Sequence, residues 1–122
     1  MKAASLSRLK QEMKNRSASE LLEICLRLIR YKKENKELLT YLLFEMQDEQ
    51  AYIKSIQQEM ELQFSEFNKS NLYWAKKSIR KIGRMTSKFI RYSGKKETEV
   101  ELYMHYCLCL KESGIPIDSS VA

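Results

Sequence analysis

The chain has 122 residues, with 22 Lys or Arg against 16 Asp or Glu, and its formal net charge is +6. This length suits one domain that buries a core without metals or disulfides, and it leaves no room for a second domain of ordinary size. Three Gly and one Pro are too few turn residues for a sheet built of hairpins, so β-rich folds are disfavoured. We expect an all-α fold of about five antiparallel helices, with a single domain over residues 1–114 and a flexible tail over residues 115–122.

The cysteine pattern and the hydropathy bear on the compartment. The three cysteines, at positions 25, 107 and 109, form an odd set without CxxC spacing, and the N-terminus has no apolar signal core. The longest apolar run, residues 38–44, is far shorter than the roughly 20 residues of a membrane-spanning helix. We therefore expect a cytoplasmic protein with reduced thiols and no membrane span.

The first 33 residues predict two helices. One covers residues 6–15, and Ser17 and Glu20 then form an S/T-x-x-E capping box that starts the next helix. That second helix ends near Lys33. Its apolar residues recur at steps of three and four, which predicts one buried stripe: Leu21, Leu22, Cys25, Leu28 and Ile29.

Residues 35–68 carry an unbroken helical rhythm after Asn35, which we expect to cap a third helix. Two structures fit the rhythm. One is a single helix of about 34 residues and about 50 Å, and the other is two helices separated at residues 47–49 with Asp48 as N-cap. We favour the single helix. Such a rod would protrude from a small domain unless a partner covered it, so a homo-oligomer is among the expected assemblies.

The stretch 69–96 holds ten Lys or Arg and no Asp or Glu. Ser70 or Asn71 would cap this basic helix, and Gly94 would end it. Its core stripe is predicted to be Leu72, Ala75, Ile79, Ile82, Thr86 and Phe89. Gly83 in its middle indicates either close packing of a neighbouring helix or a kink, or else the approach of a phosphate or of a partner's backbone, and we favour the first of these two accounts.

The last predicted helix begins with Glu97, Glu99 and Glu101, which suit the positive end of its dipole, and it ends at Gly114. Residues 100–110 are apolar on nearly all sides of this helix. That pattern predicts deep burial against several neighbours.

A short internal sequence similarity links the two halves of the chain. Residues 28–34 (LIRYKKE) resemble residues 89–92 (FIRY) followed by Lys95, Lys96 and Glu97, at a separation of about 61 residues. The local pattern is loosely similar to HEAT-like helix pairs, which implies a short α-solenoid of two helical hairpins as an alternative to a bundle. Coincidence explains this internal similarity equally well, and the resemblance to HEAT-like helix pairs assigns no functional residue.

Catalytic and metal-binding patterns are scarce. His105 and Cys109 lie four residues apart on one helix, at the spacing that would suit a nucleophile and a base or two metal ligands. A catalytic thiol needs exposure and a low pKa, and a structural zinc normally needs four ligands. We interpret the pair as packed helix residues and expect no enzyme activity, no metal and no cofactor.

The basic helix supports two functions. Its candidate binding residues are Lys76, Lys77, Arg80, Lys81, Arg84, Lys88 and Arg91, with candidate aromatic contacts at Tyr73, Trp74 and Tyr92, although for Trp74 an edge position on the core is favoured. The first interpretation is a non-catalytic protein-interaction or scaffold module that binds an acidic partner. The alternative is a sequence-nonspecific RNA or DNA binder in which cations meet phosphates and aromatics stack on bases. Six acidic residues between 45 and 66 would lie beside the basic helix and neutralise part of it.

Overall fold

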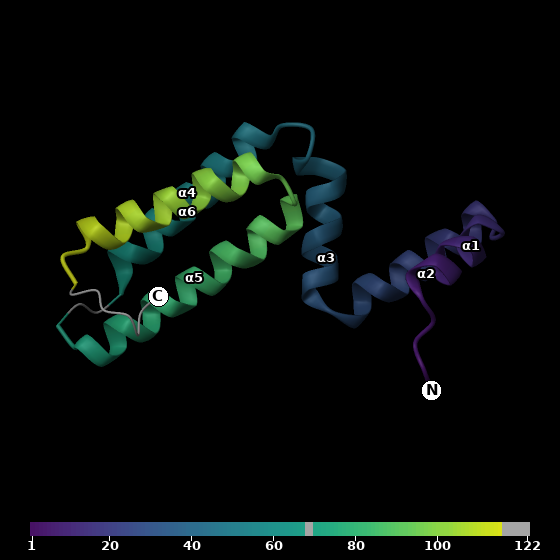
Figure 1. Cartoon of the computed structure of the whole chain (residues 1–122), viewed down its shortest axis with the longest axis horizontal. Helices are drawn as coiled ribbons and strands as arrows, with labels where there is room; N and C mark the ends of the chain where they lie inside the picture. Colours follow the sequence, from purple (N-terminus) through teal and green to yellow (C-terminus); the bar gives the residue numbers. More distant parts are fainter. Residues whose placement is uncertain (68–69, 116–122) are drawn as a thin grey trace. The chain divides into compact units, whose positions relative to one another are not determined.

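The computed structural model describes residues 1–67 and 70–115, and the regular structure in these ranges is entirely helical (Figure 1). The described residues form α1 (Leu6–Lys14), α2 (Ala18–Tyr31), α3 (Lys33–Thr40), a π-helical turn η1 (Tyr41–Glu45), α4 (Glu49–Glu66), α5 (Leu72–Ser93) and α6 (Lys96–Glu112). The all-α prediction is therefore confirmed, with six α-helices where about five were expected.

The chain divides into two compact units, residues 1–40 and 41–122. The single domain expected over residues 1–114 stays a prediction. Of the expected tail, residues 116–122 lie outside the described residues. Ile115 is buried in the core of the second unit, so it does not belong to a loose tail.

In the first unit, the first two predicted helix starts are confirmed. Ser5 caps α1, and the Ser17 Oγ accepts a hydrogen bond from the Glu20 amide at 3.1 Å while the Glu20 carboxylate accepts from the Ser17 amide at 3.3 Å. Asn35 does not cap α3 as predicted. Its side-chain Nδ2 donates a hydrogen bond to the Leu28 carbonyl at 2.7 Å and so satisfies a backbone acceptor near the C-terminal end of α2.

The stripe predicted to be buried on α2 is not buried, which corrects the sequence-based prediction: Leu21 and Ile29 are half-buried, and its other three residues are exposed. None of the α2 residues is buried; Leu22 and Leu28 are 59% and 55% exposed, and Cys25 is exposed. The physical reason is size: about 40 residues in three short helices cannot enclose a core. Periodicity identified an apolar face correctly, but the unit contains too little material to cover it.

The expected single helix over residues 35–68 is wrong, because α3 and α4 are separate. After α3 the backbone forms the π-helical turn, closed by a hydrogen bond from the Met46 amide to the Tyr41 carbonyl at 2.9 Å. Asp48 then caps α4 by accepting from the Ala51 amide at 3.2 Å. This is the alternative that the sequence left open. The apolar rhythm continues across the break and therefore does not reveal it.

Helices α4, α5 and α6 form an antiparallel three-helix bundle in which each helix packs against the other two (Figure 1). The α5 stripe is confirmed at Ala75, Ile79, Ile82 and Thr86, whereas Leu72 is 49% exposed and Ile90 is buried in place of the half-buried Phe89. The core is completed by side chains of the other two helices and of η1: Tyr41, Tyr52, Ile53, Ile56, Met60, Phe64, Leu102, Cys109 and Leu110.

Helix α6 is less buried than its sequence predicts. Thr98, Leu102, Cys109 and Leu110 face the core, but Val100, Tyr103, Met104 and Leu108 are between 41% and 67% exposed. The expected burial on nearly all sides is therefore wrong within the bundle. Within the bundle, two neighbouring helices cover only one side of α6, and on its outward side Val100, Met104 and Leu108 stay exposed beside the exposed Glu101.

Gly83 lies where α6 approaches α5 closely, as predicted. The Tyr106 hydroxyl donates to the Ile79 carbonyl at 3.0 Å, and a Cβ at position 83 would lie 3.0 Å from the Tyr106 Oη. The missing side chain thus makes room for the tyrosine ring. At the end of α5, Gly94 adopts a left-handed conformation with φ of 69°, which confirms it as the cap residue.

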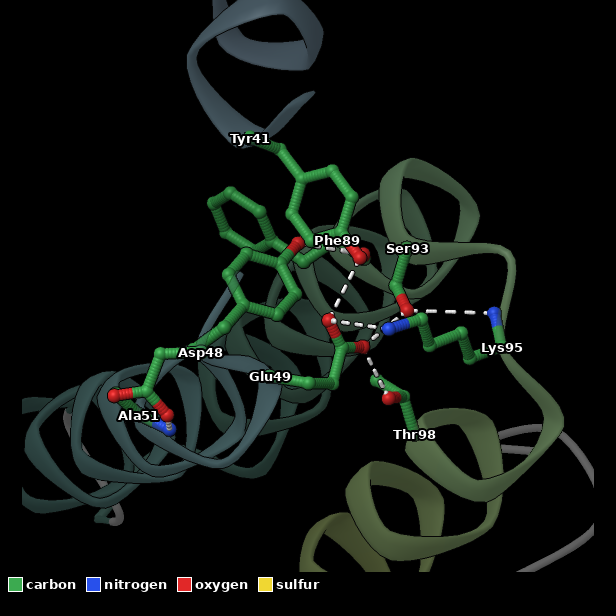
Figure 2. A network of polar contacts seen from close by, with 9 residues as sticks. Tyr41, Asp48, Glu49, Ala51, Phe89, Ser93, Lys95 and Thr98 are labelled. Atoms are coloured by element: carbon green, nitrogen blue, oxygen red, sulfur yellow. Dashed lines mark hydrogen bonds and ion pairs between the residues drawn. The ribbon is translucent and has the colours of Figure 1, made fainter. Parts of the chain in front are cut away.

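One end of the bundle is held by the Glu49 carboxylate (Figure 2). It accepts hydrogen bonds from Ser93 Oγ and Thr98 Oγ1, both at 2.5 Å, and from Tyr41 Oη at 2.7 Å, while Lys95 Nζ lies 3.7 Å from it. Burial acts to raise the pKa of Glu49, but the hydrogen bonds and the Lys95 charge outweigh burial and lower this pKa below its ordinary value. The carboxylate therefore joins η1, α4, α5 and α6.

Candidate binding surface on helix α5

The outward side of α5 carries the predicted basic residues. Lys77, Arg80, Lys81, Arg84 and Arg91 are exposed, opposite the stripe that packs into the core. At 1.5 Å per residue, the row from Lys77 to Arg91 is about 21 Å long. Asn71 orients the start of the helix by accepting from the Trp74 amide at 3.3 Å. We call these five residues the basic face.

The two remaining predicted cations are not among these exposed residues. Lys76 and Lys88 are half-buried, and both have interaction partners in the molecule. The Lys88 ammonium also lies 5.3 Å from the centre of the Phe89 ring. These two lysines therefore have less freedom to meet a ligand than the five residues of the basic face.

The aromatic candidates separate into two groups. Tyr73 and Trp74 are 66% and 50% exposed, their ring centres are 5.2 Å apart, and Lys77 Nζ lies 5.0 Å from the centre of the Trp74 ring. The Trp74 ring therefore does not lie at the edge of the core, which is the position favoured from the sequence. Tyr92, in contrast, is half-buried and packs against the core beside Phe89. An exposed aromatic pair thus stands at the N-terminal end of the basic face.

Acidic side chains lie beside one flank of α5, as the sequence suggested. An open groove between α4 and α5 is lined by Glu59, Gln63, Glu66, Phe67, Ser78, Lys81 and Ile82. Lys81 thus shares a groove with two carboxylates. Surface ion pairs of this kind contribute about 0 to 1 kcal/mol each, and residues on the outward side of α5, such as Arg80 and Arg84, do not line this groove.

The charge is divided unevenly between the two units, which sequence reasoning on the basic helix alone missed. Residues 1–40 carry ten Lys or Arg and five Asp or Glu, whereas residues 41–122 carry twelve and eleven. Nearly all the net positive charge therefore belongs to the first unit. The basic face is a local feature of an almost neutral bundle, and a count of charges in each half of the chain would have revealed this.

The geometry of His105 and Cys109 does not suit nucleophilic catalysis. Cys109 is 8% exposed, and burial raises the pKa of its thiol, with a further contribution from the charges of Glu61 and Glu112. His105 Nε2 lies 3.0 Å from the Glu61 carboxylate, within ion-pair distance but without hydrogen-bond geometry. A thiol nucleophile would need the reverse, exposure and a lowered pKa.

No cluster of three or more His, Cys, Asp or Glu side chains suited to a metal occurs in the described ranges. Within the same residues, no helix combines the length and hydropathy needed to cross a bilayer. No protein-family model matches the chain, and neither a curated protein nor a solved structure is significantly similar to it. Any indication of function therefore comes from the surfaces of the molecule.

Proposed function

We propose that this chain is a non-catalytic interaction module that binds an acidic protein surface through the basic face of α5. The observation that carries the proposal is the row of exposed cations, Lys77 to Arg91, on a helix that contains no Asp or Glu. Such a row would attract carboxylates and orient a partner, and it would contribute more to association rate and specificity than to raw affinity.

The aromatic pair adds to this proposal. Tyr, Trp and Arg are the residue types that most often dominate binding energy at protein interfaces. Tyr73 and Trp74 are exposed beside Lys77, where they would supply an apolar anchor next to the charges. The three unpaired thiols of the chain support the reducing cytoplasm as the proposed location.

A nucleic-acid surface is the second candidate, and the exposed Tyr73 and Trp74 rings favour it because aromatic rings stack on unpaired bases. Two observations weigh against it. Glu59 and Glu66 border one flank of α5, where they would repel phosphates. The bundle that carries the basic face is also almost neutral, whereas nucleic-acid-binding domains are usually strongly basic.

Fluorescence anisotropy over a salt series tests the proposal. The probes are a labelled poly-glutamate peptide and a labelled oligothymidylate of matched charge. The decisive variant is Arg80→Glu/Arg84→Glu, which replaces one like-charged i, i+4 pair by another and so changes helix stability little. The matched control is Arg8→Glu/Lys10→Glu, which gives the same change in net charge on exposed positions of α1.

We expect the α5 variant to weaken poly-glutamate binding at least about tenfold, a typical loss for reversed charges at an interface, and the α1 variant to weaken it much less. An equal loss in both variants would mean that only net charge matters, and the basic face would be rejected as the site. Tighter binding of oligothymidylate, with a steep salt dependence that Arg80→Glu/Arg84→Glu reduces, would favour the nucleic-acid candidate instead.

A further inference from the structure

The outward side of α6 is an apolar stripe without a covering element in the bundle. Val100, Met104 and Leu108 follow one another at steps of four residues and are 55%, 67% and 49% exposed. Tyr103 and Cys107 border the stripe and are also exposed. Helices α4 and α5 contact the opposite side, where Leu102 and Cys109 are buried.

The two ends of the stripe carry opposite charges. Glu97 lies one turn before Val100, and Lys111 lies one turn after Leu108, and both side chains are exposed. The positions 97, 100, 104, 108 and 111 are separated by three, four, four and three residues, so their spacing is symmetric about Met104. These positions project from one face of the helix.

We propose that this face of α6 binds a second copy of the chain in an antiparallel, two-fold symmetric dimer centred on Met104. In that register Val100 packs against Leu108 of the other copy, and the two Met104 side chains meet on the symmetry axis. Glu97 then lies beside Lys111 of the other copy, twice per dimer. A two-fold interface requires one surface patch that complements itself. The Glu97 and Lys111 charges of the two copies are complementary only when the two helices are antiparallel.

The size of the stripe sets the expected strength. From Val100 to Leu108 the helix rises about 12 Å, and contact along such a short helix pair falls at or below the roughly 1,200 Å² of the smallest stable interfaces. The dimer should therefore be reversible and dependent on concentration. The proposed dimer face and the basic face of α5 share no residue, so dimerisation leaves the proposed partner site open.

Sedimentation equilibrium of the full chain at several concentrations tests the proposal. We expect the wild type to form a reversible dimer and Met104→Asp to weaken it at least about tenfold, because a charge would be buried on the symmetry axis. The matched control is Leu62→Asp on α4, where Leu62 is 50% exposed. This control should retain the wild-type dimer.

Charge reversal tests the register. Glu97→Lys and Lys111→Glu should each weaken the dimer about tenfold, since each change converts two attractive pairs into two repulsive ones. An equimolar mixture of the two variants should recover wild-type affinity, because both pairs are then opposite in sign again. In a parallel dimer neither single variant would weaken association, and that result would overturn the register.

Two further outcomes would overturn the proposal itself. A wild-type chain that stays monomeric at all concentrations would mean that no second copy covers this stripe. A dimer that persists in Met104→Asp but dissociates in Leu62→Asp would place the interface on α4. Circular dichroism of each variant identifies any loss of helix that would otherwise be mistaken for loss of binding.

Discussion

Replacement of Glu49 tests whether one half-buried carboxylate holds the end of the bundle together. Three hydroxyl groups, from Tyr41, Ser93 and Thr98, donate to this carboxylate, and its side chain is only 15% exposed. Glu49→Gln keeps the shape of the side chain but removes its charge. In this variant the amide oxygen can still accept hydrogen bonds from two of the hydroxyls. The amide nitrogen is a donor, so the third hydroxyl would have to accept a hydrogen bond instead of donating one.

The expected cost follows from the number of hydrogen bonds. Hydrogen bonds to a charged group contribute about 1.5 to 3 kcal/mol each, against about 0.5 to 1.5 kcal/mol for neutral ones. Glu49→Gln should therefore lower the free energy of unfolding by about 1 to 3 kcal/mol. Glu49→Ala should lower it by about 3 to 5 kcal/mol, because it also leaves the fully buried Thr98 hydroxyl without its acceptor.

Urea unfolding of the full chain, followed by circular dichroism, measures these losses, with Glu59→Gln on the same helix as the exposed control. The pH dependence gives a second readout. The folded pKa of Glu49 is lowered, so its stabilisation is complete above the unfolded pKa of about 4.3 and is lost as the pH falls through the folded value. Glu49→Gln should flatten this acid dependence. Equal losses in the Glu49 and Glu59 variants, or an unchanged acid dependence, would refute the reasoning.

Two further predictions concern α5 and α6. Gly83→Ala should leave the free energy of unfolding unchanged or lower it by up to about 2 kcal/mol. The reason is that steric strain against Tyr106, of about 1 to 3 kcal/mol, equals or exceeds the gain in helix propensity of about 1 kcal/mol. In a Tyr106→Phe background the same change should stabilise the protein. A double-mutant cycle measured by urea unfolding checks this, and a coupling energy near zero would contradict it. In the native state, a thiol reagent should modify Cys25 and Cys107 rapidly and the buried Cys109 only upon unfolding. Mass spectrometry of the labelled peptides checks this, and equal rates at the three sites would contradict it.

Local chemistry was predictable from the sequence where the partners are near in the chain. The Ser17 capping box, the Asn71 cap and the Gly94 terminus each involve residues three or four positions apart, and all three occur as expected. The exposed row of the basic face also followed from periodicity on α5. Asn35 shows the limit of such reasoning, because a residue suited to start a helix instead satisfies the end of the preceding one.

Interactions between distant residues left no such signal. Glu49 bonds to Ser93 and Thr98, which lie 44 and 49 positions away, and in the sequence it was one acid among several before the basic helix. The same is true of His105 and Glu61, which come together across two helices. Only tertiary packing distinguishes Glu49 from its exposed neighbours, and only tertiary packing brings His105 to the exposed Glu61.

Helix α6 shows why an apolar pattern predicts burial but does not name the neighbour. A helix that is apolar nearly all round is one that is covered on more than one side. The bundle covers the side with Leu102 and Cys109, and the sequence gives no reason for Val100, Met104 and Leu108 to be apolar unless a second surface meets them. The proposed dimer supplies that surface, so the expected deep burial of α6 would be met by two copies of the chain together and not by one bundle alone.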